Sequence, residues 1–126
     1  MIIACICKPS CPEGERKKFA IGVANSIGGK ITGALWLRLS KDDCSNIYHE
    51  HIHKSFYSEL ERCMTHGITT IYTIDCDDID WERLTAFKTS YRKKHGLKKD
   101  CPDNWVHCPD TAEANNGIIK VYKKNI

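Results

Sequence analysis

The chain has 126 residues and a formal net charge of +3. This length suffices for one domain whose apolar core needs neither disulfides nor a metal ion. The hydrophobic content of 41% and the charged content of 28% are those of an ordinary globular protein, so we expect a single domain over residues 1–126. The small positive charge does not favour binding to nucleic acid, but it suits an anionic small substrate.

Neither a membrane span nor a secretion signal is predicted. No apolar run approaches the roughly 20 residues that cross a bilayer, and residues 1–7 lack the basic stretch of a signal peptide. We therefore expect a cytoplasmic protein in which cysteines stay reduced and pack as small apolar side chains. Their even number leaves a disulfide framework as the alternative. The eight cysteines are Cys5, Cys7, Cys11, Cys44, Cys63, Cys76, Cys101 and Cys108.

The predicted elements mix strands and helices in an α+β order. Hydrophobic periodicity and the placement of Gly, Pro and capping residues decide each assignment. In the first half, strands are expected over residues 2–7 and 30–39, and helices over residues 13–27, 40–49 and 55–65. In the second half, a strand is expected over 68–74, a helix over 79–87, a long loop over 88–109, a short helix from 110 and a final strand over 118–122.

His107 is the first candidate for a catalytic residue. It lies in the segment Asn104-Trp-Val-His107-Cys-Pro-Asp110, which we expect to be irregular, and Asp110-Thr111 looks like the start of a helix. A neutral imidazole attacks phosphorus well, and a helix N-terminus nearby favours an anion. The segment therefore suggests phosphoryl transfer through a phosphohistidine, with an ordinary loop histidine as the alternative.

Three other patterns in the sequence are candidates for a metal-binding or phosphate-binding site. His49, His51 and His53 near Cys44 would share a face and bind zinc if they were in a strand, whereas in a helix they would form a solvated helix end. The basic run over residues 92–94, continued by Lys98-Lys99, is either a phosphate clamp or a solvated surface. Gly29-Lys30 is not a Walker A motif, because neither the first glycine nor the final hydroxyl residue is in place.

Several segments together resemble the nucleoside diphosphate kinase family, nearly from end to end. The family carries its nucleophilic histidine in Asn-x-x-His-Gly-Ser-Asp-Ser, and the corresponding segment is 104–111, from Asn104 to Thr111. Its first strand ends in Lys-Pro-Asp, and here residues 8–10 read Lys-Pro-Ser. Its Phe-Tyr-x-x-His, Arg-Pro-Phe-Phe and Met-x-x-Gly motifs correspond to residues 47–51, 54–57 and 64–67.

The resemblance implies a fold, an activity and a set of site residues. The fold is a ferredoxin-like antiparallel four-stranded sheet with helices packed on one face. The activity is transfer of the γ-phosphoryl group of a nucleoside triphosphate to a nucleoside diphosphate through phospho-His107, with Mg²⁺ bound through the nucleotide phosphates and no protein metal ligand. The implied nucleotide-binding residues are Lys8, Tyr48, Phe56, Leu60, Arg83, Thr89, Arg92, Lys94 and Asn104. A homo-oligomer built from dimers is also expected.

The sequence departs from the family pattern at places that bear on catalysis. Pro109 replaces a serine next to the histidine, and Ile118 stands where the family has the glutamate that orients the imidazole, with Glu113 as a possible substitute. About six residues are missing from the loop that builds the trimer contact of hexameric relatives, so Arg92 and Lys94 are the candidates for its arginine. A nucleotide-binding module without catalysis is therefore the main alternative to a kinase. A protein that binds a metal ion through cysteine and histidine is the third hypothesis.

Overall fold

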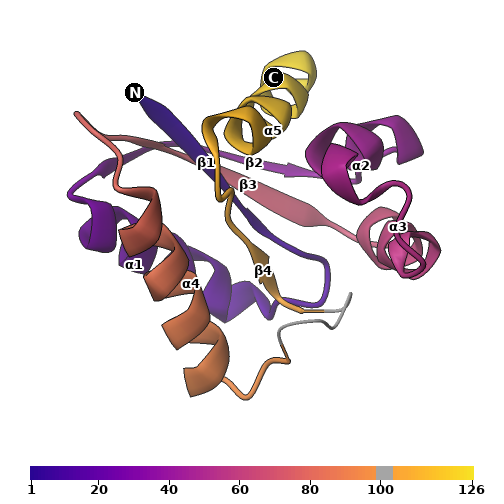
Figure 1. Ribbon diagram of the computed structural model, residues 1–126, viewed down its shortest axis with the longest axis horizontal. Coiled ribbons are helices and arrows are strands. Elements are labelled where there is room, and N and C mark those ends of the chain that lie inside the picture. Colours follow the sequence, from indigo (N-terminus) through magenta and orange to yellow (C-terminus); the bar gives the residue numbers. More distant parts are fainter. Residues whose placement is uncertain (99–103) are drawn as a thin grey trace.

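A four-stranded antiparallel sheet forms the centre of the computed structural model, which describes residues 1–98 and 104–126 (Figure 1). The strands lie in the order β2 (Lys30–Leu37), β3 (Thr69–Asp75), β1 (Ile2–Cys7) and β4 (Val106–His107). The central strand β1 pairs with β3 on one side, and on the other side it pairs Ile6 with His107 and Cys7 with Val106. The predicted α+β class and the antiparallel four-stranded sheet are confirmed.

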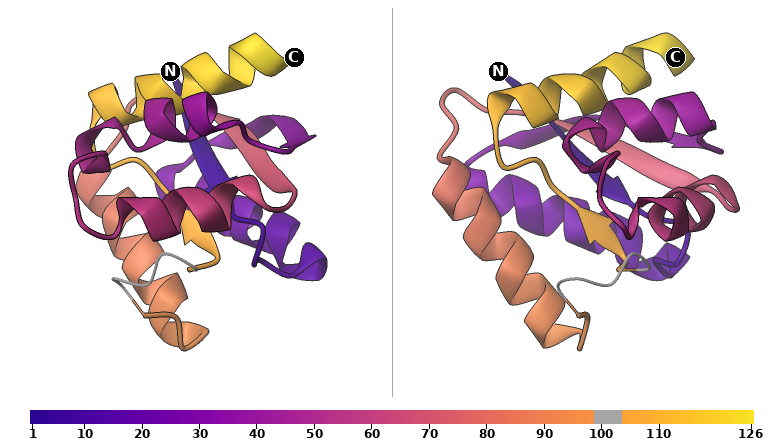
Figure 2. Two further views of the ribbon diagram at one scale, coloured as in Figure 1. Left: turned by 90° about the vertical axis from the view of Figure 1, so that its right-hand side faces the viewer. Right: turned by 45° about the vertical axis from the view of Figure 1, so that its right-hand side comes forward.

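Helices cover both faces of this sheet (Figures 1 and 2). Ile3, Cys5 and Cys7 of β1 face an apolar cluster that includes residues of α1 (Glu13–Ile27) and α4 (Trp81–Lys94). Ala4 and Ile6 face a second cluster with residues of α2 (Lys41–Ile47), α3 (Tyr57–Thr65) and α5 (Ala112–Asn125). The expectation of helices on one face was wrong, because β1 is apolar at every position from Ile3 to Cys7 and buries both of its faces.

Several predicted boundaries agree with the structure. Helix α1 has the expected bounds, and it ends at Gly28, whose φ of 66° lies in the left-handed region that favours glycine. A capping box begins α2: the hydroxyl of Ser40 accepts from the backbone N of Asp43, and the carboxylate of Asp43 accepts from the backbone N of Ser40. No helix in the described ranges is long and apolar enough to cross a membrane.

The predicted final strand over residues 118–122 was wrong, because these residues belong to α5. The β-branched Ile118, Ile119 and Val121 favoured a strand. In the helix, however, the buried residues are Asn115, Ile118 and Val121, which are three apart and share one face. Thr111 begins the helix, as its hydroxyl accepts from the backbone N of Ala114. The fourth strand is instead Val106–His107.

The predicted loop over residues 88–109 is shorter in the structure. Helix α4 continues to Lys94, since Leu84, Lys88 and Tyr91 are buried on one of its faces. His107 then lies at the end of β4 rather than in an irregular segment. Lys99 and Cys101, which belonged to the basic run and to the cysteine set, lie outside the described residues.

Candidate functional site

His107 occupies the edge of the sheet, where β4 runs beside the central strand. Its backbone pairs with Ile6 of β1. Its imidazole packs on the phenol ring of Tyr48, which directly follows α2, with ring centroids 4.7 Å apart. A hydrogen-bonded strand on one side and a buried aromatic ring on the other therefore limit where the imidazole can point.

Cationic side chains from two elements reach the same strand. Lys8 follows β1; its backbone N donates to the carbonyl of Trp105 at 2.7 Å, and its Nζ lies 6.0 Å from the centroid of the Tyr48 ring. Arg92 of α4 donates from Nη2 to the carbonyl of Val106 at 3.1 Å. The ends of β1 and α4 thus place positive charge on both sides of His107.

A third cation, Lys88 of α4, was not predicted as a site residue. Its Nζ donates to Oδ1 of Asp110 at 2.9 Å and lies 3.5 Å from the carbonyl oxygen of Cys108. Burial raises the pKa of Asp110, but the hydrogen bond from Lys88 outweighs it and lowers that pKa below its usual value. Sequence reasoning missed Lys88 although it falls on the same helical stripe as Leu84 and Tyr91.

This environment keeps the His107 imidazole neutral. Burial, followed by the charges of Lys8, Lys88 and Arg92 and by His51, lowers the pKa of His107 well below 6.5. A neutral imidazole has a lone pair available for attack, and the surrounding cations stabilise negative charge that arrives or develops there. The site is therefore suited to a nucleophile that acts on an anionic group.

Nothing in the described structure holds the second imidazole nitrogen. Nε2 of His107 is buried and has no hydrogen-bond partner among the described residues. Ile118 is fully buried in the apolar cluster that includes Tyr48, so the position of the family's glutamate has no polar group to offer. Glu113 lies exposed in the first turn of α5.

The other predicted residues near β4 fall into supporting and surface positions. Asn104 is buried and donates from Nδ2 to the carbonyl of Lys98 at 2.9 Å, so it fixes the approach of the chain to β4. Leu60 is buried in the cluster with Tyr48. Phe56 is 40% exposed, and its ring lies 5.6 Å from that of His51. Phe56 therefore offers an open aromatic face at the end of this group of rings.

The predicted residues of α4 separate into different places. Thr89 and Arg92 line a hollow of about 490 Å³ together with Lys88 and Asp110. Arg83 is exposed in the first turn of the helix and does not line that hollow. Nine residues of helix place Arg83 roughly 13 Å from Arg92 along the axis. The structure therefore does not bring Arg83 to the group around His107.

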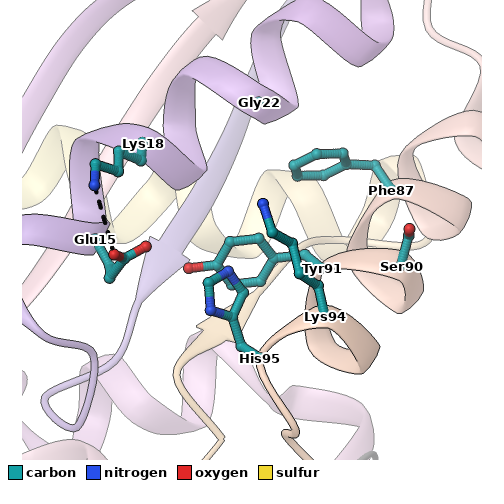
Figure 3. Close-up of a pocket in the computed structure, with 8 residues that line it drawn as sticks. All are labelled: Glu15, Lys18, Gly22, Phe87, Ser90, Tyr91, Lys94 and His95. Carbon is teal, nitrogen blue, oxygen red and sulfur yellow. Dashed lines mark ion pairs between the residues drawn. The ribbon is translucent and has the colours of Figure 1, made fainter.

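Lys94 faces a second hollow, of about 360 Å³, between α1 and α4 (Figure 3). Lys18 and Glu15 of α1 form an ion pair at one side of it, at 3.7 Å. The rings of Tyr91 and His95 lie at the other side, with centroids 4.3 Å apart. Lys94 thus lies apart from the residues that surround His107.

The three alternating histidines do not share a face of a strand. His49 and His51 lie in a 3-10 helix, His49–His51, that follows α2. Among the described residues, no group of three or more His, Cys, Asp or Glu side chains is arranged to hold a metal ion.

Comparisons with known proteins reveal a likeness in structure but not in sequence. No protein-family model matches the chain, and no curated protein sequence matches it. A nucleoside diphosphate kinase from Aquifex aeolicus superposes with a TM-score of 0.71 at 19% identity, covering 96% of this chain and 93% of the kinase. A nucleoside diphosphate kinase from Encephalitozoon cuniculi gives a TM-score of 0.74 at 13% identity, covering 96% of this chain and 87% of the kinase. A nucleoside diphosphate kinase family protein from Babesia bovis gives 0.70 at 19%, covering 98% and 90%.

These likenesses extend over nearly the whole of each chain, so they concern the complete arrangement of sheet and helices. Identities below 20% carry the fold and not the activity. The chain has the α+β fold of the nucleoside diphosphate kinases.

Proposed function

We propose that the protein transfers the γ-phosphoryl group of a nucleoside triphosphate to a nucleoside diphosphate through a phosphohistidine at His107. The observation that supports this most is the neutral imidazole on β4, packed on Tyr48 and flanked by Lys8, Lys88 and Arg92. The fold adds support, because the kinases it resembles are named for this transfer.

The reaction proceeds in two half-reactions. Nε2 of His107 is buried, so we assign the attack to Nδ1. Its lone pair forms a bond to the γ-phosphorus while the bond from phosphorus to the β–γ bridging oxygen breaks, and the nucleoside diphosphate leaves. A second nucleoside diphosphate then attacks the phosphohistidine and regenerates the neutral imidazole. Lys8 and Arg92 neutralise charge on the transferred group, so catalysis consists of positioning and electrostatic stabilisation.

The nucleotide would lie across the residues that the resemblance implies. Lys8, Tyr48, Thr89, Arg92 and Asn104 would hold the phosphates and the sugar, whereas Arg83 and Lys94, which lie apart from this group, would not contact them. The open ring of Phe56 and the side chain of Leu60 would contact the base, which permits broad use of nucleotides.

Mg²⁺ would enter with the nucleotide. The side chains around His107 are cationic, and the nearby carboxylate of Asp110 is held by Lys88. The donor set therefore fits a metal ion bound through phosphate oxygens rather than through protein ligands. Bound in this way, Mg²⁺ supplies charge neutralisation of the phosphates.

Labelling with γ-³²P-ATP tests the proposal directly. We expect a label on the reduced wild-type protein that is stable to alkali and labile to acid, and its release on addition of a nucleoside diphosphate. His107→Ala should lose the label, whereas His53→Ala, at an exposed histidine, should keep it. Nucleotide binding without any label would contradict the transferase and support a non-catalytic nucleotide-binding module.

A dimer-based homo-oligomer in the cytoplasm completes the proposal. Sedimentation of the purified chain tests the assembly, since a monomer at micromolar concentration would contradict it.

A further inference from the structure

Two cysteines flank the turn that carries Lys8. Cys7 ends β1, and Cys11 follows a turn that closes when the backbone N of Cys11 donates to the carbonyl of Lys8 at 2.9 Å. Sγ of Cys7 donates to the carbonyl of Arg16 at 3.8 Å and Sγ of Cys11 donates to the carbonyl of Pro12 at 3.6 Å, so both thiols lie at the start of α1 within the same apolar cluster. Neither thiol is part of a disulfide. A bond between the two sulfur atoms would therefore need only a local adjustment.

The surroundings of the two thiols make them chemically unequal. Cys11 directly precedes Pro12, the N-cap of the 15-residue helix α1, and Nε of the buried Arg16 donates to the carbonyl of Cys11 at 3.1 Å. The interaction with Cys7, followed by the charge of Arg16, lowers the pKa of Cys11 below its ordinary value, although burial opposes it. The interaction with Cys11, followed by burial, raises the pKa of Cys7.

The two thiols also differ in their access to solvent, and Cys11 is the more accessible of the two. Cys7 is fully buried, whereas Cys11 is 2% exposed beneath the exposed Pro12 and the half-buried Ser10. A small opening of this turn exposes Cys11 before Cys7. An oxidant of the size of water therefore meets Cys11 first, and Cys7 is available only to a group already inside the protein.

We propose that Cys11 is a site of reversible oxidation by hydroperoxides and that Cys7 completes a disulfide with it. The Cys11 thiolate attacks the terminal peroxide oxygen, the O–O bond breaks, and hydroxide leaves from hydrogen peroxide or alkoxide from an alkyl hydroperoxide, which gives a sulfenic acid. Sγ of Cys7 then attacks Sγ of Cys11, the S–O bond breaks, and the Cys7 proton leaves with the hydroxyl as water. Two thiols lose two electrons in total, and one peroxide becomes two waters or a water and an alcohol.

The disulfide would alter the position of Lys8. The carbonyl of Lys8 accepts from Cys11 N and from Nη2 of Arg16, and the backbone N of Lys8 donates to Trp105. Pulling Cys7 and Cys11 together acts on all three contacts. This consequence rests on the proposed function, in which Lys8 holds the nucleotide phosphates, whereas the disulfide itself does not.

Peptide mass spectrometry tests the disulfide independently of any nucleotide. The reduced full chain is treated with hydrogen peroxide, alkylated and digested with trypsin. Because Pro9 follows Lys8, residues 1–16 remain one peptide that contains Cys5, Cys7 and Cys11. We expect this peptide to take three alkyl groups before oxidation and one afterwards, with fragments that place the link between Cys7 and Cys11. Three alkyl groups after peroxide, or a link that involves Cys5, would overturn the proposal.

Single substitutions separate the roles of the two thiols. Cys7→Ser should leave a sulfenic acid on Cys11 that dimedone traps, and Cys11→Ser should form no link. Cys63→Ser, at a cysteine of α3 on the other face of the sheet, should behave as wild type. Dimedone on Cys7 rather than Cys11 in the corresponding single variants would reverse the assignment and contradict the proposal.

Nucleotide affinity tests the link to Lys8. ADP binding should weaken about tenfold in the oxidised wild type, the equivalent of one lost charge-assisted hydrogen bond, and recover on reduction with a dithiol. Oxidised Cys11→Ser should bind as before. Disulfide formation with unchanged ADP affinity would refute the effect on Lys8, whereas no ADP binding by the reduced protein would count against the proposed function instead.

Discussion

At the scale of residues, the pocket around His107 offers a neutral imidazole that is suited to nucleophilic attack, but only part of that ring is held in place. Burial, followed by the charges of Lys8, Lys88 and Arg92, keeps the imidazole neutral, but its Nε2 has no partner in the described part of the chain. An imidazole held from one side only can rotate or adopt the wrong tautomer, and the reaction then loses alignment. The fully buried Ile118 stands where the resemblance to the nucleoside diphosphate kinases implies an orienting glutamate.

Ile118→Glu should therefore raise the rate of His107 phosphorylation by about tenfold or more. A carboxylate there would accept from Nε2 and orient the ring, although a buried acid also lowers the thermal midpoint. Val121→Glu is the matched control, because Val121 is equally buried on the same face of α5 and should lose stability without any gain in rate. Equal rates of single-turnover labelling in the two variants would argue against a missing orienting group.

The sequence identified more of this pocket by resemblance than by pattern. Residue patterns alone pointed to His107 and to the basic run that includes Arg92, and the family motifs added Lys8, Tyr48 and Asn104, which the structure places around or next to β4. Lys88 was missed because the helix was predicted to end at residue 87, which left Lys88 in the loop rather than on the buried face of α4. Its partners, Asp110 and the carbonyl of Cys108, lie far away in the sequence, so only the folded chain reveals them.

At the scale of elements, α5 is attached to the central strand through one polar side chain. Asn115 accepts the backbone N–H of Ala4 at 2.9 Å and donates to the carbonyl of Ile2 at 2.8 Å. These bonds satisfy β1 beyond the end of the two-residue strand β4, where its backbone would otherwise be buried without partners. The amide of Asn115 thus makes the hydrogen bonds to β1 that a longer β4 would otherwise make.

Asn115→Ala should lower the free energy of unfolding by about 1–3 kcal/mol, because the buried N–H of Ala4 and the part-buried carbonyl of Ile2 lose their partners. Asn116→Ala, at the exposed neighbouring position, should change it by no more than about 0.5 kcal/mol. Urea unfolding followed by circular dichroism measures both. A similar loss in the two variants would mean that helix propensity, and not the contact with β1, sets the stability.

Local sequence signals located the helix ends that are marked by a glycine or by a capping box. Gly28 and the Ser40 capping box identified the end of α1 and the start of α2 within one residue. The last helix was mistaken for a strand because Ile118, Ile119 and Val121 are β-branched, and tertiary packing of their helical face decided otherwise. The two-residue strand β4 carries no periodic signal, so its pairing with β1 was outside the reach of pattern reasoning.

At the scale of the whole molecule, keeping the half-buried His107 neutral makes stability depend on pH. The pKa of His107 is well below 6.5 in the folded protein and about 6.5 in the unfolded chain. Between these values the unfolded state binds more protons, so stability is lost as the pH falls through 6.5 and regained as it rises.

We expect wild type to lose about 1 kcal/mol more unfolding free energy than His107→Gln between pH 7 and pH 5.5. The carboxylates of Asp43 and Asp110 do not interfere in this range, because their pKa values lie below 3.8 and their contribution is lost only at lower pH. Urea unfolding at the two pH values measures the difference. Parallel losses in the two proteins would show that His107 is not buried in its neutral form.

The sheet register has a consequence for the order in which the chain can fold. β1 is made before every segment it pairs with: Ile2 pairs with Asp75, Ile6 pairs with His107, and Ala4 binds a side chain 111 residues away. A growing chain therefore presents an apolar strand without partners until β3 has left the ribosome, and the nucleophile reaches its place only after that. Such distant pairing slows folding and exposes aggregation-prone intermediates, so His107 reaches its place only when nearly the whole chain is assembled.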